Sequence, residues 1–198
     1  MQSLPTADTL DAIAADVHEV IEIALANSTV LDRFTGTAVL NRDQATEIGV
    51  LGYVARASGL ELDARRAHPF VDVYDNLHVP VLYTGDVLAR FQLRVDEFDA
   101  SIALLRQLLP RVDPGGFTNT PVPRPGRPVS GVGIVEGWRG TILHRVELAA
   151  DGTITRNKVV DPSFFNWPAL AVALADTIVP DFPLANKSFN LSYAGNDL

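Results

Sequence analysis

Three side chains suited to acid–base or anion chemistry lie close together in the last third of the chain, namely Glu136, Arg139 and His144. A glutamate in a dry cavity can carry a proton because burial shifts its pKa, whereas arginine stays charged and presents a fixed fork of donors. Glu136 is thus either a proton carrier or the ion-pair partner of Arg139, and we favour the ion pair. Arg139 either organises a polar cavity or pairs with Glu136 or a backbone carbonyl. His144 lies in a strand-like run, where a lone histidine is more often structural than a ligand.

Other sets of chemically active residues lack the spacing that catalysis needs. The sequence contains no cysteine, so it offers no disulfide, thiolate ligand or cysteine nucleophile. His18, His68 and His78 have no metal-ligand spacing with one another or with a carboxylate pair. Asp161 precedes Pro162, which is typical of a turn or a helix cap. The sequence therefore shows no independent catalytic constellation.

Two long helices are expected in the first half of the chain. Thr6 or Asp8 can cap the first, which runs to about Asn27. The second runs from Asp86 to Leu109, with an apolar seam at steps of three and four formed by Leu88, Phe91, Val95, Phe98, Ile102, Leu105 and Leu109. Such a seam is typical of helices that pack at a shallow angle, so we predict a helical bundle. The polar segment 56–66 between these helices is expected at the surface or at a subunit contact.

The second half changes character after a segment rich in proline and glycine. Residues 113–130 are expected to form an extended linker. Strands are predicted at 132–135, 140–148 and 153–160, with a hairpin turn at Asp151-Gly152, and helices are expected to follow. The predicted fold is α+β and mainly helical: a long-helix bundle over 1–112, then a small antiparallel sheet and C-terminal helices over 131–198, packed as one unit with the first part.

Charge and hydropathy exclude some classes of partner. The net charge is −8 and no basic run occurs, so nucleic acid is not expected as a partner. No apolar stretch approaches the roughly 20 residues of a membrane-spanning helix, and the N-terminus lacks the features of a signal peptide. We therefore expect a cytoplasmic protein, located peripherally on the cytoplasmic face of a membrane.

Several short segments together resemble a known family. The chain resembles the C-terminal half of the large subunit of nickel–iron hydrogenases of the hydrogenase-4 and formate-hydrogenlyase type, and is similar to the 49-kDa (D) subunit of complex I. The segments that carry the resemblance are Arg56–Gly59 with Asp63 and Arg65, Phe91–Glu97, Glu136–His144, Asp161–Pro168 and Asn186–Leu198. The resemblance implies an oxidoreductase, either a hydrogenase or an NADH–quinone oxidoreductase.

The resemblance also implies where metal ligands would lie. In the hydrogenases, two pairs of cysteines hold nickel and iron, and the second pair aligns with Ser192 and Gly195 of this chain. Neutral serine is a poor ligand for a metal that selects thiolates, and glycine has no side chain. We therefore expect no metal site on this chain and no activity of the chain by itself. Arg139 aligns with the arginine that faces the metal cavity in the hydrogenases.

Three functions remain open at this point. We favour a shortened subunit that forms part of the structure or cavity of a multisubunit redox complex, without its own nickel–iron centre. Its expected partners are an N-terminal half or equivalent chain (or a second copy, through the 86–109 helix), a small subunit carrying an iron–sulfur cluster, and membrane-arm subunits. The alternatives are a quinone or electron-transfer subunit, with quinone as a possible cofactor, and a soluble binding domain with no redox role.

Overall fold

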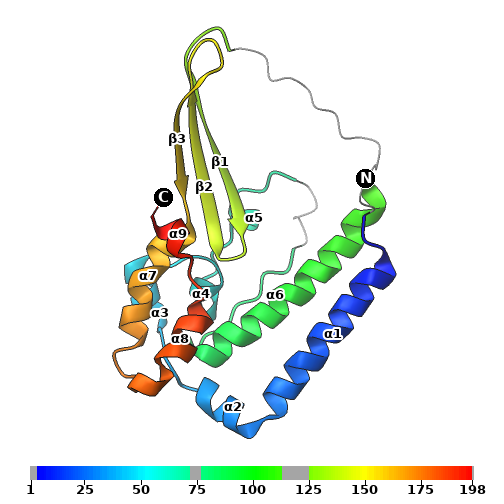
Figure 1. The fold of residues 1–198 in the computed structure, drawn as a ribbon, viewed down its shortest axis with the longest axis vertical. Coiled ribbons are helices and arrows are strands. Elements are labelled where there is room, and N and C mark those ends of the chain that lie inside the picture. Colours follow the sequence, from blue (N-terminus) through cyan, green and yellow to red (C-terminus); the bar gives the residue numbers. More distant parts are fainter. Residues whose placement is uncertain (1–3, 72–76, 113–124, 198) are drawn as a thin grey trace.

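The structure is a computed structural model, and it describes residues 4–71, 77–112 and 125–197. In these ranges a helical body carries a three-stranded sheet that projects from one end (Figure 1). In chain order, the elements are α1 (Ala7–Ala26), α2 (Ser28–Phe34), α3 (Arg42–Ile48), α4 (Gly52–Ala57), α5 (Ala64–Ala67), α6 (Val87–Leu108), η2 (Leu109–Arg111), β1 (Val129–Gly137), β2 (Gly140–Leu148), β3 (Ile154–Val160), α7 (Pro162–Ala173), η3 (Val179–Asp181), α8 (Phe182–Phe189) and α9 (Tyr193–Asn196). The predicted α+β, mainly helical fold is confirmed.

The two long helices, α1 and α6, lie side by side (Figure 1). Thr6 begins α1, since its side chain accepts a hydrogen bond from the Thr9 amide. Asp86 begins α6 in the same way by accepting from the Ala89 amide. Capping of this kind satisfies amides that have no partner inside the helix. No helix in the described ranges is long and apolar enough to cross a membrane.

The apolar seam expected on α6 is not its most buried face. Of the seven seam residues only Ile102 is buried, whereas Val87, Ala89, Arg90 and Leu93 on the neighbouring face are buried. That face packs against α4 and α8. This face contains an alanine and an arginine beside Val87 and Leu93, so it is less apolar in sequence than the predicted seam. A prediction from hydrophobicity alone therefore selects the seam, which α1 covers only in part.

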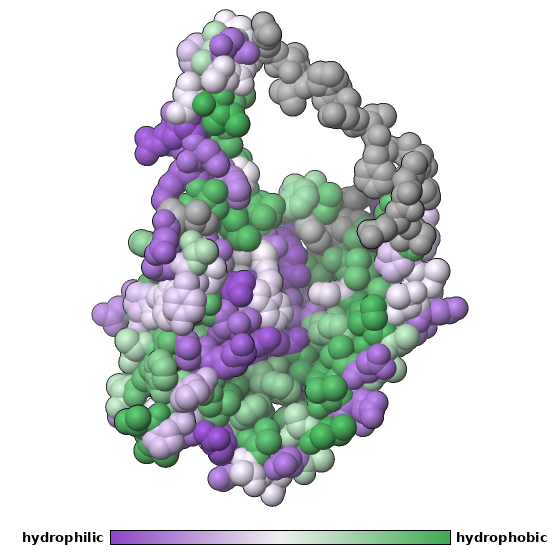
Figure 2. Space-filling view, viewed as in Figure 1, coloured by the Kyte–Doolittle hydropathy of each residue, from purple (hydrophilic) through white to green (hydrophobic). Residues whose placement is uncertain are grey.

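The core lies where the short helices α3, α4, α7 and α8 meet α6. Its largest apolar members include Tyr53 on α4, Leu93 on α6 and Phe189 on α8, each at most 2% exposed. Contacts of α3 with α7, and of α6 with α8, tie the N-terminal helices to the C-terminal ones. Hydrophilic residues form a band across one face of this body, between hydrophobic areas (Figure 2).

The sheet is antiparallel with strand order β1-β2-β3. A tight turn joins β1 and β2 and pairs Gly137 with Gly140, and the Thr153 amide donates to Asp151 in the second turn. The predicted hairpin is confirmed. Strand β1 begins at Val129, so positions 129 and 130 of the expected linker belong to the strand, and 113–124 lie outside the described residues.

The expectation that segment 56–66 lies at the surface was correct only in part, since Glu61, Leu62 and Arg66 are exposed but residues 56–59 and 63–64 are buried. Arg56 and Asp63 are buried, with exposures of 3% and 6%, and Ser58 donates a hydrogen bond to the Leu40 carbonyl from within the core. The buried polar residues Arg56, Ser58 and Asp63 find charged or backbone partners there. The sequence pattern alone does not reveal these partners, because they come from α6 and β1.

Candidate functional site

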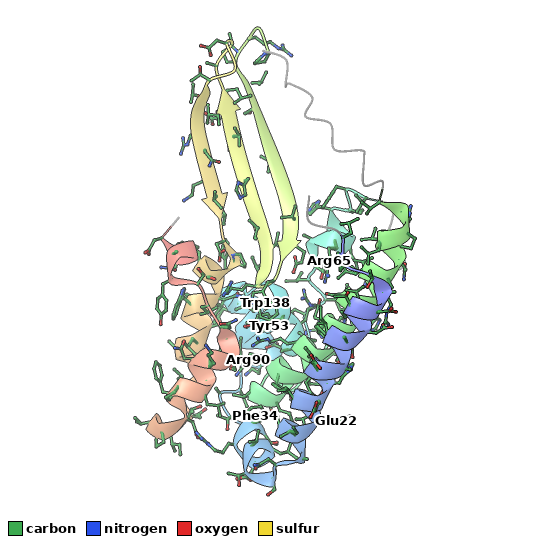
Figure 3. The ribbon with its side chains drawn as sticks, turned by 45° about the vertical axis from the view of Figure 1, so that its right-hand side comes forward. Glu22, Phe34, Tyr53, Arg65, Arg90 and Trp138 are labelled. Carbon is green, nitrogen blue, oxygen red and sulfur yellow. The ribbon has the colours of Figure 1, made fainter. Side chains whose placement is uncertain are left out.

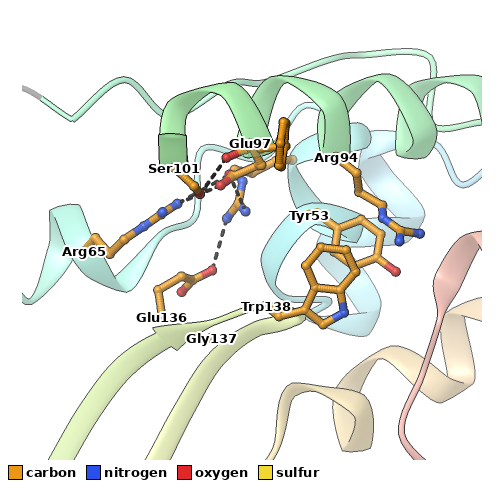
Figure 4. A pocket seen from close by; sticks show the side chains of 10 residues that line it. Tyr53, Arg65, Arg94, Glu97, Ser101, Glu136, Gly137 and Trp138 are labelled. Carbon is orange, nitrogen blue, oxygen red and sulfur yellow. Dashed lines mark hydrogen bonds and ion pairs between the residues drawn. The ribbon is translucent and has the colours of Figure 1, made fainter. Parts of the chain in front are cut away.

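A cavity of about 360 Å³ lies between α4, α6 and the end of the β1–β2 hairpin (Figure 4). One end of the cavity carries charged side chains, and the other carries aromatic rings. Its lining residues are Tyr53, Arg56, Arg65, Arg94, Glu97, Phe98, Ser101, Glu136, Gly137 and Trp138. The volume is within the range of about 300–1,000 Å³ that is usual for small-molecule sites.

Arg56 is the centre of the charged end. Its guanidinium lies 2.8 Å from a Glu97 carboxylate oxygen, 3.1 Å from one of Glu136 and 3.2 Å from one of Asp63. It also donates to the Leu62 carbonyl, while its Nε has no hydrogen-bond partner. An arginine with three carboxylates around it joins α4, α6 and β1 through one side chain.

Arg65 completes this group, which we call the charge network: Arg56, Asp63, Arg65, Glu97 and Glu136. The Arg65 guanidinium lies 2.6 Å from a carboxylate oxygen of Asp63 and 3.2 Å from one of Glu97. Two guanidinium groups therefore face three carboxylates, and the network carries one surplus negative charge when all five groups are ionised. An unmatched buried charge of this sign favours the uptake of a proton.

The two most buried carboxylates of the charge network respond in opposite ways. Burial raises the pKa of Glu136, and the neighbouring Asp63 charge adds to the rise, although the Ala64 amide and Arg56 oppose it. Burial also acts to raise the pKa of Asp63, but the hydrogen bonds and charge of Arg65 outweigh it, so this pKa is lowered. Glu136 is therefore the member of the charge network best suited to hold a proton.

The local chain path places Glu136 against the helices. The Ala64 amide at the start of α5 donates to Glu136 over 3.0 Å, and the Thr141 hydroxyl donates to it over 2.9 Å. Gly52 at the start of α4 has a φ of +65°, and a Cβ there would lie 2.1 Å from the Arg139 carbonyl oxygen. Only glycine permits so close an approach, which brings the hairpin turn onto α4.

The aromatic end of the cavity consists of Tyr53 and Trp138, with ring centroids 6.0 Å apart. The Arg94 guanidinium lies 4.5 Å from the Trp138 ring centroid and 5.8 Å from that of Tyr53, which is cation–π geometry. The Tyr53 hydroxyl donates to the Ser188 carbonyl over 3.1 Å, and burial raises the Tyr53 pKa to about 12. Tyr53 therefore stays protonated near neutral pH. Figure 3 shows Tyr53 and Trp138 between the sheet and the helices.

The expected ion pair between Glu136 and Arg139 was wrong. Glu136 on β1 pairs with Arg56 on α4 and accepts from the Ala64 amide on α5, whereas Arg139 lies in the turn and donates through Nε to the Asn190 carbonyl. The two side chains point to different partners because the tight turn separates them. Arg139 thus binds a backbone carbonyl, which was the other structural possibility for it.

His144 does not join the other two predicted site residues. It lies on β2 opposite Gly133 and Val159, is exposed, and lines a shallow depression on the sheet. His18 on α1 pairs with Asp99 over 2.9 Å at the surface. Within the described ranges, no group of three histidine, aspartate or glutamate residues is placed to hold a metal ion.

Ser192 and Gly195, which align with the hydrogenase cysteines, have structural contacts of their own. The Ser192 hydroxyl caps α9 by accepting a hydrogen bond from the Gly195 amide over 3.0 Å. A Cβ on Gly195 would lie 2.5 Å from the carboxyl carbon of Asp161, whose side chain caps α7 through the Ser163 amide. Position 195 therefore has no room for a cysteine unless Asp161 moves.

Several residues of the cavity lining and of the charge network were not identified as site candidates from the sequence. Arg56, Asp63 and Arg65 were noted only within a segment that resembles the family, while Tyr53 and Arg94 were not noted as site residues at all. The available signal was the mixture of arginine and aspartate in 56–65 beside a strongly helical, glutamate-bearing segment. Pairing them requires the three-dimensional arrangement, since Arg56 and Glu136 are far apart in sequence.

Comparisons with known proteins agree with this architecture. The model of the family "Respiratory-chain NADH dehydrogenase, 49 Kd subunit" matches residues 5–125. The carbon monoxide-induced hydrogenase of Rhodospirillum rubrum is 32% identical over 174 residues, covering 87% of this chain and 48% of that protein. The NADH-quinone oxidoreductase (D) subunit of Syntrophobacter fumaroxidans is 33% identical over 172 residues, covering 84% and 44%.

A solved structure with the same fold belongs to the membrane-bound sulfane sulfur reductase, an archaeal respiratory membrane complex. The TM-score is 0.85 at 25% identity, and the match covers 96% of this chain and 54% of that one. The chain thus spans about half the length of the curated relatives that it matches. On the family model and these relatives together, the chain belongs to the family of the 49-kDa subunit of respiratory-chain NADH dehydrogenase, which includes related hydrogenase subunits.

Proposed function

We propose that the chain is a cavity-forming structural subunit of a multisubunit redox complex and holds no nickel–iron centre of its own. The observation that carries this proposal is the packing at position 195, where the Asp161 carboxylate fills the space of a side chain. Together with the absence of cysteine from the 198 residues, this leaves no thiolate to hold a soft metal. Redox cofactors, such as an iron–sulfur cluster, then belong to a partner subunit.

Further support comes from how the arginines of the site are used. Arg56 and Arg139, which project from α4 and the hairpin turn, both make contacts within the chain. They join the hairpin to the helices, as expected for a scaffold. The proposed partners are a polypeptide equivalent to the other half of the relatives, a small iron–sulfur subunit and membrane-arm subunits. We place the complex on the cytoplasmic face of a membrane.

Affinity purification of the tagged chain from its native source tests this proposal. We expect an iron–sulfur polypeptide and membrane subunits to be enriched in constant ratio to the chain, as measured by quantitative mass spectrometry. A Gly52→Ala variant is the matched control, because its Cβ would meet the Arg139 carbonyl and displace the hairpin. The proposal is contradicted if the tagged chain purifies without other subunits from detergent-solubilised membranes and the Gly52→Ala variant does the same.

A second candidate function is proton transfer beside a bound quinone. It is favoured by one feature, the surplus negative charge of the charge network next to an aromatic-lined cavity of about 360 Å³. In this role Glu136 takes up a proton and Tyr53 and Trp138 contact the ring. Titration with a soluble ubiquinone analogue, followed through Trp138 fluorescence, tests it. We expect saturable quenching that Trp138→Phe removes, and quenching that is linear in quinone concentration contradicts this role.

A further inference from the structure

A second, smaller pocket adjoins the cavity and has a different chemical character. Its walls come from α2, α6 and α8, and its volume is about 120 Å³. Phe34, Val87, Phe91 and Leu184 form an apolar floor, and the Phe34 and Phe91 rings lie 5.5 Å apart. Arg94 and Lys187 also line the pocket, together with Ser188. We call this the α2–α6–α8 pocket.

The two cations of the α2–α6–α8 pocket lack carboxylate partners. Among the described residues, neither Arg94 nor Lys187 lies within 4 Å of a carboxylate oxygen, and the pocket lining contains no acidic residue. The nearby Asp86 side chain is already used, since it accepts from the Gly36 and Ala89 amides and from Thr84. Arg94 is held in place by Trp138 and Tyr53 instead of by an acid.

Arg94 and Lys187 differ from the arginines of the charge network, which are paired with carboxylates. One turn of α6 away from Arg94, Glu97 is already paired with Arg56 and Arg65. The chain as a whole has a net charge of −8, with more acidic than basic residues, so two neighbouring cations without an acidic partner are unexpected in it. An oriented guanidinium and an ammonium beside an apolar floor are complementary to a carboxylate attached to an apolar group.

The size of the α2–α6–α8 pocket restricts what occupies it. A volume of about 120 Å³ is well below the range of about 300–1,000 Å³ that is usual for small-molecule and cofactor sites. It suits a single side chain, as in the anchor pockets that dominate protein interfaces. An acidic residue beside that anchor would reach Arg94 and Lys187 at the rim.

We propose that the α2–α6–α8 pocket docks a partner polypeptide through one aromatic or large aliphatic side chain flanked by acidic residues, which pair with Arg94 and Lys187. The inference rests on the proposed function, because it describes the chemistry of a subunit contact in the complex. It adds that the contact is electrostatically steered and weakens with salt, since Lys187 is exposed to solvent.

Titration of the full chain with defined peptides tests the docking site. The probe is acetyl-Gly-Glu-Phe-Glu-Gly-amide, and the controls are its Lys-Phe-Lys and Glu-Ala-Glu counterparts and hexanoate. Binding is followed by the amide chemical shifts of Phe91, Leu184 and Lys187. We expect saturable shifts with the probe alone. Lys187→Glu should weaken binding about tenfold, since it replaces an attraction with a repulsion.

A matched variant separates local from overall charge. Arg156→Glu, on the exposed strand β3, changes the net charge by the same amount at a distance from the pocket and should leave binding unchanged. Equal weakening by Arg156→Glu overturns the inference, as does equal binding of either control peptide. Binding of hexanoate without the probe assigns the pocket to free carboxylates and also overturns it. The assay uses the isolated chain, so its failure differs from a failure of complex assembly.

Discussion

Two regions of the molecule each bury an arginine, and they neutralise its charge differently. In the charge network, Arg56 is surrounded by the carboxylates of Asp63, Glu97 and Glu136. At the junction of α6 and α8, Arg90 donates to the Gly85 and Ala38 carbonyls and the Ser188 hydroxyl, and its guanidinium carbon lies 4.3 Å from the Phe189 ring centroid. One arginine has partners that titrate, and the other has partners that do not.

The difference separates a pH-sensitive region from a pH-insensitive one. Burial lowers the pKa of Arg90 to about 10, so this arginine remains charged at neutral pH and holds the C-terminal helices unchanged. The charge network instead contains Glu136, whose pKa burial raises, and Asp63, whose pKa Arg65 lowers. Of these two regions, the charge network is therefore the one whose stability should depend on pH.

Arg56→Met should have the largest effect. It leaves two buried carboxylates and the partly buried Glu97 with Arg65 as their only remaining cation in the charge network, and breaking a buried ion pair costs about 3–5 kcal/mol. Without Arg56 the carboxylates bind protons more readily in the folded state, so the loss should be smaller at pH 5 than at pH 7.5. Urea unfolding at both pH values measures it, and a loss that is equal at both would contradict the titrating role of this region.

Arg90→Met should have the next largest effect. It leaves the buried Ala38 carbonyl without a donor, at a cost of about 1–3 kcal/mol, while the Gly85 carbonyl keeps the Leu40 amide. The removal of a buried charge offsets part of this cost. Because the hydrogen-bond partners of Arg90 do not titrate, and Asp86 acts on it only through its charge, the loss of unfolding free energy should be nearly the same at pH 5 and pH 7.5. A pH-dependent loss at Arg90 would remove the distinction between the two regions.

Gly195→Ala tests whether packing excludes a side chain at the position that aligns with a metal-binding cysteine. The new Cβ meets the Asp161 carboxylate, and overpacking of this kind costs about 1–3 kcal/mol. Gly131→Ala on β1 is the control, since nothing lies within 4 Å of a Cβ there. The thermal unfolding midpoint of Gly195→Ala should be well below that of Gly131→Ala. The reverse order would refute the steric argument.

Glu136→Gln should have the smallest effect on stability, about 1 kcal/mol, because one amide oxygen replaces two acceptor oxygens. Its signature lies in the pH dependence. A carboxyl whose pKa is raised by folding stabilises below its unfolded pKa of about 4.5, and this contribution disappears as pH rises through the folded pKa. The unfolding free energy of the unsubstituted chain should therefore fall as pH rises above about 4.5, and Glu136→Gln should not show this fall. Unfolding free energies between pH 4 and pH 8 measure the difference.

Asp63 provides the internal comparison for that experiment. Its lowered pKa gives stability that is present above its unfolded value of 3.8 and lost as pH falls below it. Asp63→Asn should therefore change the acid side of the pH profile, whereas Glu136→Gln changes the neutral side. If both substitutions altered the same pH window, the two carboxylates would not have the separate environments described above.

Much of the fold was predictable because its signals are local. The Thr6 and Asp86 caps, the apolar periodicity of α6 and the Asp151-Gly152 turn each depend on residues that are close in sequence. The burial of Arg56, Ser58 and Asp63 was not predictable in this way. From the sequence alone, Arg56 is expected at the surface. In the fold it is paired with Glu97 on α6 and Glu136 on β1, which are distant in sequence.

The candidate site shows the same division between local and distant information. The sequence identified Glu136 and Arg139 as residues of interest, but it paired them with each other because they are neighbours along the chain. The turn at Gly137–Gly140 directs them to partners on different elements. Likewise, Trp138 and Arg94 meet only through tertiary packing, so no spacing rule indicates their contact.

The nickel content of the purified chain tests the central claim most directly. The chain is expressed with nickel and iron in the medium, isolated from any partner, and analysed by mass spectrometry of its metals alongside a nickel-binding protein as the positive control. The proposed structural role predicts nickel far below one equivalent per chain and well below the control. One equivalent of nickel retained through gel filtration would contradict it.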